Sequence, residues 1–196
     1  MADTKLIIPT EDFTPRRTFL TRAGQAGLSA AAVALIAGCN TMATQTAANA
    51  DSASNDIDIL NTALGLEYEA IAAYQVGAES KLLKQPALGL AVTFQDHHKQ
   101  HAEVLASTVK KLGGTAVEPQ AKYTFPVEKL KTGNDVLRFA AGLEKGAASA
   151  YLGAVPLFKN SDLAKAAASI LGDETMHWAV LNFALGETPV PVAFIS

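Results

Sequence analysis

The sequence predicts an all-α protein whose main part is a bundle of four helices. Alanine, the strongest helix former, is abundant, whereas aromatic residues make up only 7% of the chain. Four stretches have apolar residues at alternating spacings of three and four, the period of a helix with one buried face. Short, long and short connections join these stretches, so we expect two antiparallel hairpins linked by one long crossover.

The residues at the expected helix ends support this division. Asp56 and Asp58 suit the positive N-terminal end of the first helix, and Pro86 is well placed near the start of the second. Gly113 ends the second helix, and Asn134 suits the cap of the third. The four expected helices span about 55–80, 86–112 and 134–155, and from just past 160–162 to 185.

The first 38 residues are predicted to be an export signal. Arg16 and Arg17, followed by Phe and Leu, resemble the twin-arginine (Tat) signal, which carries folded proteins across a membrane. The apolar run over 23–38 has about 16 residues, which is short of the roughly 20 that a membrane span needs. An uncleaved membrane anchor is the alternative to this cleaved signal peptide.

The only cysteine of the chain, Cys39, follows this apolar run. The residues before it resemble a bacterial lipobox, so we expect lipidation of Cys39 and anchoring to the membrane. Cleavage after Ala50, which would release a soluble protein, is the competing interpretation. Residues 39–54 are small and polar and are expected to form a flexible tether, followed by a single domain over 55–190.

An internal repeat relates the two expected hairpins. In the first helix of each hairpin, Leu, Glu, Ala, Ala and Tyr recur at the same five places. In the second helix, His101 recurs as His177, whereas His98 is aligned with Glu174. The two hairpins therefore resemble copies of one unit, as a bundle with a pseudo-two-fold axis would show. The aligned segments are 66–74 with 143–151 and 94–105 with 170–181.

Six ionisable residues fall on the apolar stripes of these helices. Burying an ionised carboxylate without a partner is costly, and the four stripes contain no Lys or Arg to offset the charge. Glu and neutral His both donate to divalent metals, so a bound cation is the economical solution. The predicted metal ligands are Glu67, His98, His101, Glu144, Glu174 and His177.

The pattern of these residues has a known counterpart. One Glu from each of two helices and Glu-x-x-His from each of the other two form the di-metal ligand set of ferritin-like proteins. Glu67, Glu144 and the segment 174–177 match that set, and 98–101 matches it except at its first residue. Over 55–190 the chain resembles the bacterial exported ferritin-like domain family, which also includes desiccation-related proteins. The resemblance implies a ferritin-like four-helix bundle.

His98 is the departure from the family pattern. The glutamate expected there commonly bridges two metals, whereas an imidazole donates one lone pair and cannot bridge in the same way. The site would contain three carboxylates, which favours a single ion or an asymmetric pair with one weak site. A divalent transition metal, iron or manganese, is the expected cofactor. His97, four residues before His101, is the alternative to His98 as the inward group.

The resemblance implies an exported metal-binding protein with an iron or manganese redox role in the cell envelope or periplasm. Oxidation of Fe(II) and disposal of peroxide are the reactions that fit, and either would make the protein a metal-dependent oxidoreductase. A non-catalytic envelope protein of the stress or desiccation type is one alternative, and a metal carrier without turnover is another. The sequence leaves open whether the protein is an enzyme.

The expected partners are the Tat export machinery and, through lipidated Cys39, the membrane. A homodimer is left open. The net charge of −3 provides no basic surface for nucleic acid. A single cysteine excludes a disulfide within the chain and Cys-rich metal sites.

Overall fold

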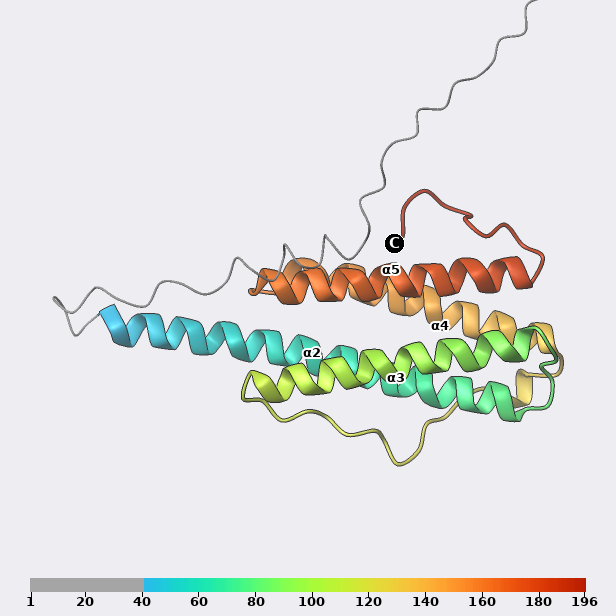
Figure 1. Cartoon of the computed structure of the whole chain (residues 1–196), viewed down its shortest axis with the longest axis horizontal. Helices are drawn as coiled ribbons and strands as arrows, with labels where there is room; N and C mark the ends of the chain where they lie inside the picture. Colours follow the sequence, from blue (N-terminus) through green and yellow to red (C-terminus); the bar gives the residue numbers. More distant parts are fainter. Residues whose placement is uncertain (1–40) are drawn as a thin grey trace, which may run out of the picture. The chain divides into compact units, whose positions relative to one another are not determined.

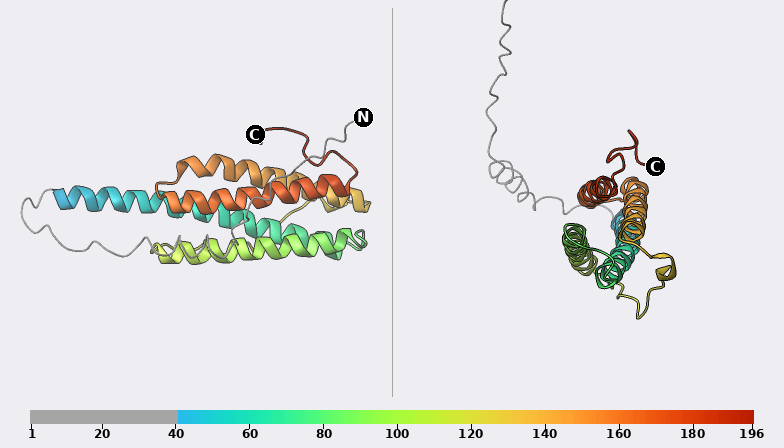
Figure 2. Two further views of the ribbon diagram at one scale, coloured as in Figure 1. Left: turned by 45° about the horizontal axis from the view of Figure 1, so that its top comes forward. Right: turned by 90° about the vertical axis from the view of Figure 1, so that its right-hand side faces the viewer.

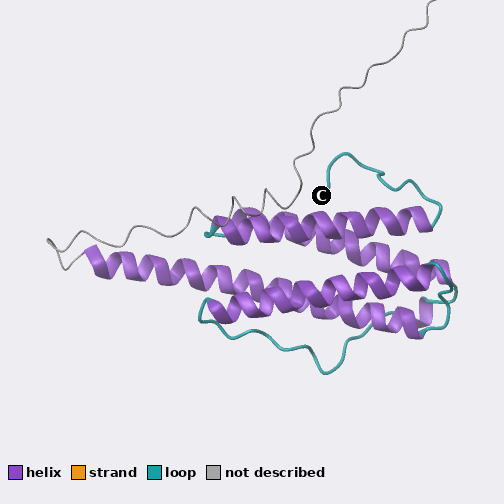
Figure 3. Cartoon of the chain, viewed as in Figure 1, coloured by secondary structure: helices purple, strands orange, loops and turns teal. Residues whose placement is uncertain are grey.

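Four long helices dominate the described part of the chain, residues 41–196 of a computed structural model, and no strand occurs within it (Figures 1 and 3). The prediction of an all-α, four-helix protein is confirmed. The helices are α2 (Thr41–Glu79), α3 (Ala87–Lys111), α4 (Gly133–Ala154) and α5 (Ser161–Ala184), with the 3-10 turns η1 (Val127–Lys129) and η2 (Val155–Leu157).

The helices form two antiparallel hairpins, as the repeat predicts. α2 packs mainly against α3, and α4 mainly against α5. The end-on view in Figure 2 shows the four helices at the corners of a square, with α2 beside α4 and α3 beside α5. The long connection between α3 and α4 runs along the outside of the first hairpin (Figure 1). This arrangement directs one face of every helix toward a common interior.

α2 begins earlier than the sequence predicts. Its first residue is Thr41 rather than a residue near Asn55, so the segment 41–54, expected to be a flexible tether, is helical. The segment is rich in alanine and contains neither proline nor glycine, so nothing in it stops a helix. Small polar residues were therefore not a reliable indicator of a flexible tether here. The first turns of α2 extend beyond the ends of the other three helices (Figure 1).

Asp56 has a different role from the one predicted. It lies inside α2 rather than at its start, and it is buried. Its two carboxylate oxygens accept hydrogen bonds from the backbone N–H groups of Lys159 and Asn160, at 2.8 and 2.9 Å. Asn160 is the N-cap of α5. Asp56 therefore satisfies the free N–H groups just before α5 and fixes that helix against α2.

The start of α4 also differs from the prediction. Thr132, not Asn134, is the N-cap, and it forms a capping box with Asp135 in which each side chain bonds the other residue's backbone N–H. Asn134 lies in the first turn instead. Gly113 follows α3 with φ of +84°, a left-handed conformation that suits glycine, so the predicted stop is confirmed.

Two apolar layers fill the bundle, with a polar layer between them. The layer near η2 includes Leu60, Leu64, Leu105, Val109 and Ile170. The layer near the α2–α3 turn includes Tyr74, Phe94, Leu137, Ala141 and Leu181. Between residues 41 and 196, no helix combines the length and the apolar character that crossing a membrane requires.

Candidate metal centre

The predicted ligands form the polar layer, because each lies between the two apolar layers on its own helix. On α2, Glu67 lies between Leu64 of one layer and Tyr74 of the other. The other three helices have the same alternation around His98, Glu144 and Glu174. Helical periodicity thus places charged groups where only apolar ones would otherwise be stable.

The structure brings all six predicted residues together. Five are buried, and the His101 side chain keeps 15% of its surface exposed. His98, not His97, is the inward member of the adjacent pair, since His98 is buried and His97 is only half-buried. The six side chains form two overlapping groups that share two members.

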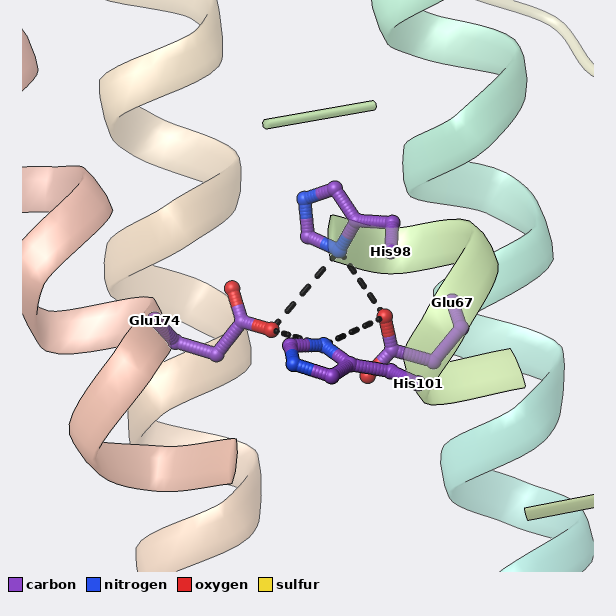
Figure 4. Close-up of side chains that lie close together, drawn as sticks. All are labelled: Glu67, His98, His101 and Glu174. Carbon is purple, nitrogen blue, oxygen red and sulfur yellow. Dashed lines mark hydrogen bonds and ion pairs between the residues drawn. The ribbon is translucent and has the colours of Figure 1, made fainter. Parts of the chain in front are cut away.

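The first group consists of Glu67, His98, His101 and Glu174, whose side chains point toward one another in Figure 4. His98 Nδ1 lies 2.8 Å from Glu67 Oε2 and 3.7 Å from Glu174 Oε1. His101 Nδ1 lies 3.2 Å from Glu174 Oε1 and 3.5 Å from Glu67 Oε2. Two imidazoles and two carboxylates therefore surround one point.

The second group consists of His98, Glu144, Glu174 and His177. His177 Nδ1 lies 3.4 Å from Glu144 Oε2 and 3.5 Å from Glu174 Oε2. His98 Nε2 lies 3.3 Å from Glu144 Oε1. This group again contains two imidazoles and two carboxylates, so the two groups repeat one arrangement, as the internal repeat predicts.

The two shared residues differ in what they can offer. Glu174 directs Oε1 to the first group and Oε2 to the second, so it can serve both. His98 also faces both groups, with Nδ1 toward the first and Nε2 toward the second. A neutral imidazole has a lone pair on only one of these nitrogens. His98 can therefore complete one group at a time, which makes the centre asymmetric.

Two buried tyrosines link the hairpins at this level. Tyr151 of α4 donates its hydroxyl hydrogen to Glu67 Oε1 on α2, at 2.6 Å. Tyr74 of α2 donates in the same way to Glu144 Oε1 on α4. Each bond holds Oε1 of a carboxylate, while Glu67 Oε2 faces His98 and His101, and Glu144 Oε2 faces His177. Helical periodicity does not reveal these bonds, because each partner lies on the other hairpin.

Asp173 is a site residue that sequence reasoning missed. Its Oδ2 lies 3.2 Å from His97 Nδ1, 3.3 Å from His177 Nε2 and 3.4 Å from His101 Nε2. It therefore contacts the outward nitrogens of both histidines whose Nδ1 atoms face the buried groups. The spacing of four residues between Asp173 and His177 is the one signal in the sequence that could have found it. A carboxylate on the far nitrogen commonly orients a metal-binding histidine.

Among the described residues, no Lys or Arg contacts the buried carboxylates of the centre, and the positive charges that balance them come from the histidines. Burial by itself lowers the pKa of His98, but its hydrogen bonds to Glu144 and Glu67 outweigh this and raise that pKa to about 10. Burial opposes protonation of His101 and His177 too, yet neighbouring carboxylates raise each pKa to about 9.

The carboxylates respond in the opposite sense. Burial by itself would raise the pKa of Glu67, but contacts with His101 and His98 lower it. The same competition, with His177 and His98 as partners, holds the pKa of Glu144 well below its usual range. Positively charged imidazoles thus stabilise ionised carboxylates, and those protons must leave before a cation can bind at the same atoms.

Five buried polar atoms of the centre have no hydrogen-bond partner among the described residues: His101 Nδ1, His177 Nδ1, Glu144 Oε2 and both oxygens of Glu174. They approach one another to 3.2, 3.4 and 3.5 Å without the alignment of a hydrogen bond. Two atoms that bind one ion at about 2.1 Å lie roughly 3.4 Å apart. The residues present therefore fit a divalent metal.

Comparison with known proteins agrees with this geometry. Residues 55–187 match the sequence pattern of the family described as Ferritin-like domain. The chain belongs to this family. The ferritin-like segment includes all four helices, from within α2 to just past the end of α5.

Two solved structures share the ferritin-like fold with this chain. A conserved hypothetical protein from Mycobacterium tuberculosis is 24% identical, with a TM-score of 0.63, over 73% of this chain and 99% of that chain. A protein from Bacillus anthracis strain Ames, described as ferritin-like and diiron-carboxylate, is 24% identical, with a TM-score of 0.58, over 68% of this chain and 97% of that chain. None of the curated proteins matches the sequence.

Proposed function

We propose that this ferritin-like protein is exported and binds one tight divalent transition-metal ion, with a weaker site for a second, to oxidise Fe(II) or remove peroxide in the cell envelope. The observation that supports it best is the set of five buried polar atoms that converge without hydrogen-bond partners. Leaving such atoms unpaired is rare in folded proteins, and cations in the two groups would satisfy them.

Each part of the chain has a distinct task in this proposal. Glu67 and His101 on one side, and Glu144 and His177 on the other, would hold the ions, while Glu174 would contact both. Tyr151 and Tyr74 hold the Glu67 and Glu144 carboxylates in place. Bound iron or manganese would supply the change of oxidation state that redox chemistry needs. The apolar layers exclude water from two sides of the centre.

Iron is the first choice of metal. The similar chain from B. anthracis is described as a diiron-carboxylate protein, and carboxylate with imidazole suits Fe(II). Manganese accepts the same types of ligand, so metal analysis must decide between them.

Elemental analysis of the protein purified from its own host tests the metal centre. We expect about one tightly bound transition-metal ion per chain, and loss of that ion in His101→Ala. Lys99→Ala is a matched control, because Lys99 is exposed on the same helix. Absence of any stoichiometric transition metal, together with unchanged thermal stability of His101→Ala, would rule the proposal out.

A metal carrier or small store without turnover is a second candidate, and His98 favours it. An imidazole that completes only one group at a time disfavours a symmetrical pair of ions, on which two-electron chemistry depends. The two functions differ in rate. A carrier would bind Fe(II) but consume neither Fe(II) nor peroxide faster than free iron does under the same conditions.

The export and anchoring part of the proposal depends on sequence alone, since Arg16, Arg17 and Cys39 lie outside the described residues. Mass spectrometry of the mature protein tests it. An acylated N-terminal Cys39 supports the anchor, and an N-terminus just after Ala50 supports release. Replacing both arginines with lysine is expected to leave the precursor uncleaved. Gel filtration of the mature protein tests whether a second copy is a partner.

A further inference from the structure

A third group of side chains of the types that bind metals lies at the edge of the buried centre. His97 and Asp173 form it together with the outward nitrogens of His177 and His101. We call these four residues the outer group. Neither His97 nor Asp173 belongs to either buried group, and the proposed function assigns no task to His97.

The outer group lies where the centre is closest to solvent, between α3 and α5. The side chains of His97 and Asp173 keep 37% and 24% of their surface exposed, and that of His101 keeps 15%. The buried carboxylates keep 3% or less. Exposure thus falls steadily from His97 to the buried centre, and a dissolved ion would meet the outer group first.

The spacing within the outer group suits a cation. Asp173 Oδ2 lies 3.2 Å from His97 Nδ1, 3.3 Å from His177 Nε2 and 3.4 Å from His101 Nε2. Ligand atoms around one ion lie roughly 3.4 Å apart when each is about 2.1 Å from it. His97 Nδ1 and His177 Nε2 are closer, at 2.8 Å, where one of the rings donates a hydrogen bond to the other.

His101 and His177 face both ways, and this links the outer group to the buried centre. In each ring Nδ1 faces the buried carboxylates and Nε2 faces Asp173. A neutral imidazole offers its lone pair from one nitrogen only. While the centre is empty, a ring that gives up the proton on Nε2 can bind a cation there, beside Asp173. Once Nδ1 binds the inner ion, Nε2 must keep its proton and donates it toward Asp173.

We propose that the outer group is a capture site, which binds an incoming divalent cation and passes it to the buried centre. This inference rests on the proposed metal centre. The transfer changes no oxidation state: the cation gains the inner ligands as it loses the outer ones, and the protons of the buried imidazoles leave to water. Asp173 then turns from a ligand of the incoming ion into the hydrogen-bond acceptor that orients the two histidines.

The rate of metal uptake by the full-length, metal-free protein tests this proposal, with Co(II) as the probe because its visible absorption reports on its ligands. In stopped-flow mixing at limiting Co(II), His97→Ala is expected to slow uptake about tenfold. This is the lower end of the loss of metal affinity or activity seen when a residue that supports the direct ligands is removed. The final Co(II) content at saturation is expected to equal that of the parent. His97→Phe, which keeps an aromatic ring against His177, should behave like His97→Ala.

Two variants serve as matched controls. Gln100→Ala truncates another exposed side chain of α3, and Asp96→Asn removes a carboxylate next to His97 without touching the outer group. Both should load Co(II) at the parental rate.

The outcomes separate this inference from the proposed function. Uptake at the parental rate in both His97 variants overturns the capture site but leaves the metal centre intact. A lower final Co(II) content in both variants also overturns it, because His97 would then be a ligand of the centre itself. If the parent binds no Co(II), the proposed function fails first. Slow uptake with full final content in both variants supports the capture site.

Discussion

His98 stands where the internal repeat places Glu174 in the other hairpin. Both are buried in the polar layer and both face the two groups. Glu174 has two oxygens to share, whereas His98 has one lone pair and no negative charge. The asymmetry of the centre therefore has its source in one residue, and exchanging that residue should remove it.

We expect His98→Glu to change the number of tightly bound ions per chain from one to two. A glutamate there would supply an oxygen to each group and a fourth negative charge, so both groups would have a full ligand set. Calorimetric titration with Mn(II) or Co(II) measures the stoichiometry. His98→Gln is the control, since it removes the imidazole without adding charge. Finding a single tight ion in His98→Glu would contradict the asymmetry argument.

The pH dependence of the metal-free protein follows from the same residues. The pKa values of His98, His101 and His177 are raised from 6.5 to about 10, 9 and 9, so their contribution to stability is complete below about pH 6.5 and disappears as pH rises toward 10. Lowered pKa values of Glu67 and Glu144 remove stability as pH falls below their usual value of 4.5.

Urea denaturation of the metal-free protein should therefore show the greatest stability at about pH 5 to 6.5, with a steady loss toward pH 10. Metal affinity should change in the opposite sense, since protons and metal compete for the same nitrogens. A stability profile that is flat between pH 6 and 10 would show that the buried histidines are not protonated in the metal-free fold.

Prediction from sequence was most successful for residues on the inward stripes. Periodicity within one helix identifies Glu67, His101 and their counterparts, because a repeat of three and four fixes which face is buried. Asp173 and His97 lie beside the stripe, and only the approach of α3 to α5 brings them together. Sequence periodicity contains no information on that approach, which explains why Asp173 was missed.

At the scale of elements, Asp56 connects the first helix to the start of the last. Its carboxylate accepts hydrogen bonds from two backbone N–H groups just before α5, although Asp56 and α5 are far apart in the sequence. Sequence reasoning assigned Asp56 to the start of its own helix. The residue type was informative, since an acidic side chain suits a helix N-terminus, but sequence alone does not say which helix.

Asp56→Ala is expected to lower the free energy of unfolding by about 2 kcal/mol, because it leaves the backbone N–H groups of Lys159 and Asn160 without their acceptors at the start of α5. Urea denaturation at fixed pH measures the loss. Asp58→Ala is a matched control: Asp58 is exposed two residues further on, and its removal should change stability by less than about 0.5 kcal/mol. Equal effects of the two substitutions would show that the contact with α5 contributes nothing.

At the scale of the whole molecule, the order and direction of the four helices followed from connection lengths and the repeat. Short connections force antiparallel neighbours, and a long one allows the second hairpin to lie beside the first. The predicted start of α2 and the predicted N-cap of α4 were wrong, because several small polar residues suit a helix, a cap or a loop equally well. Helix ends therefore remained the least predictable part.

Metal should stabilise the entire bundle, because each group takes its ligands from three helices and from both hairpins. Free metal at about 100 times its Kd should add about 2.7 kcal/mol to the free energy of unfolding, seen as a rise in Tm. Thermal denaturation with and without a chelator measures it. His101→Ala should show a much smaller rise, and an equal rise in that variant would place the stabilising ion elsewhere.

The division of the ligands between the hairpins has a consequence for how the molecule stays closed. The first group takes three residues from one hairpin and Glu174 from the other, and the second group takes three from the other hairpin and His98 from the first. Neither half of the chain holds a full set by itself. Each group is completed by one residue of the other hairpin, so an ion bound in either group links the two hairpins. Releasing the ion removes that link, and the two hairpins can then separate more easily.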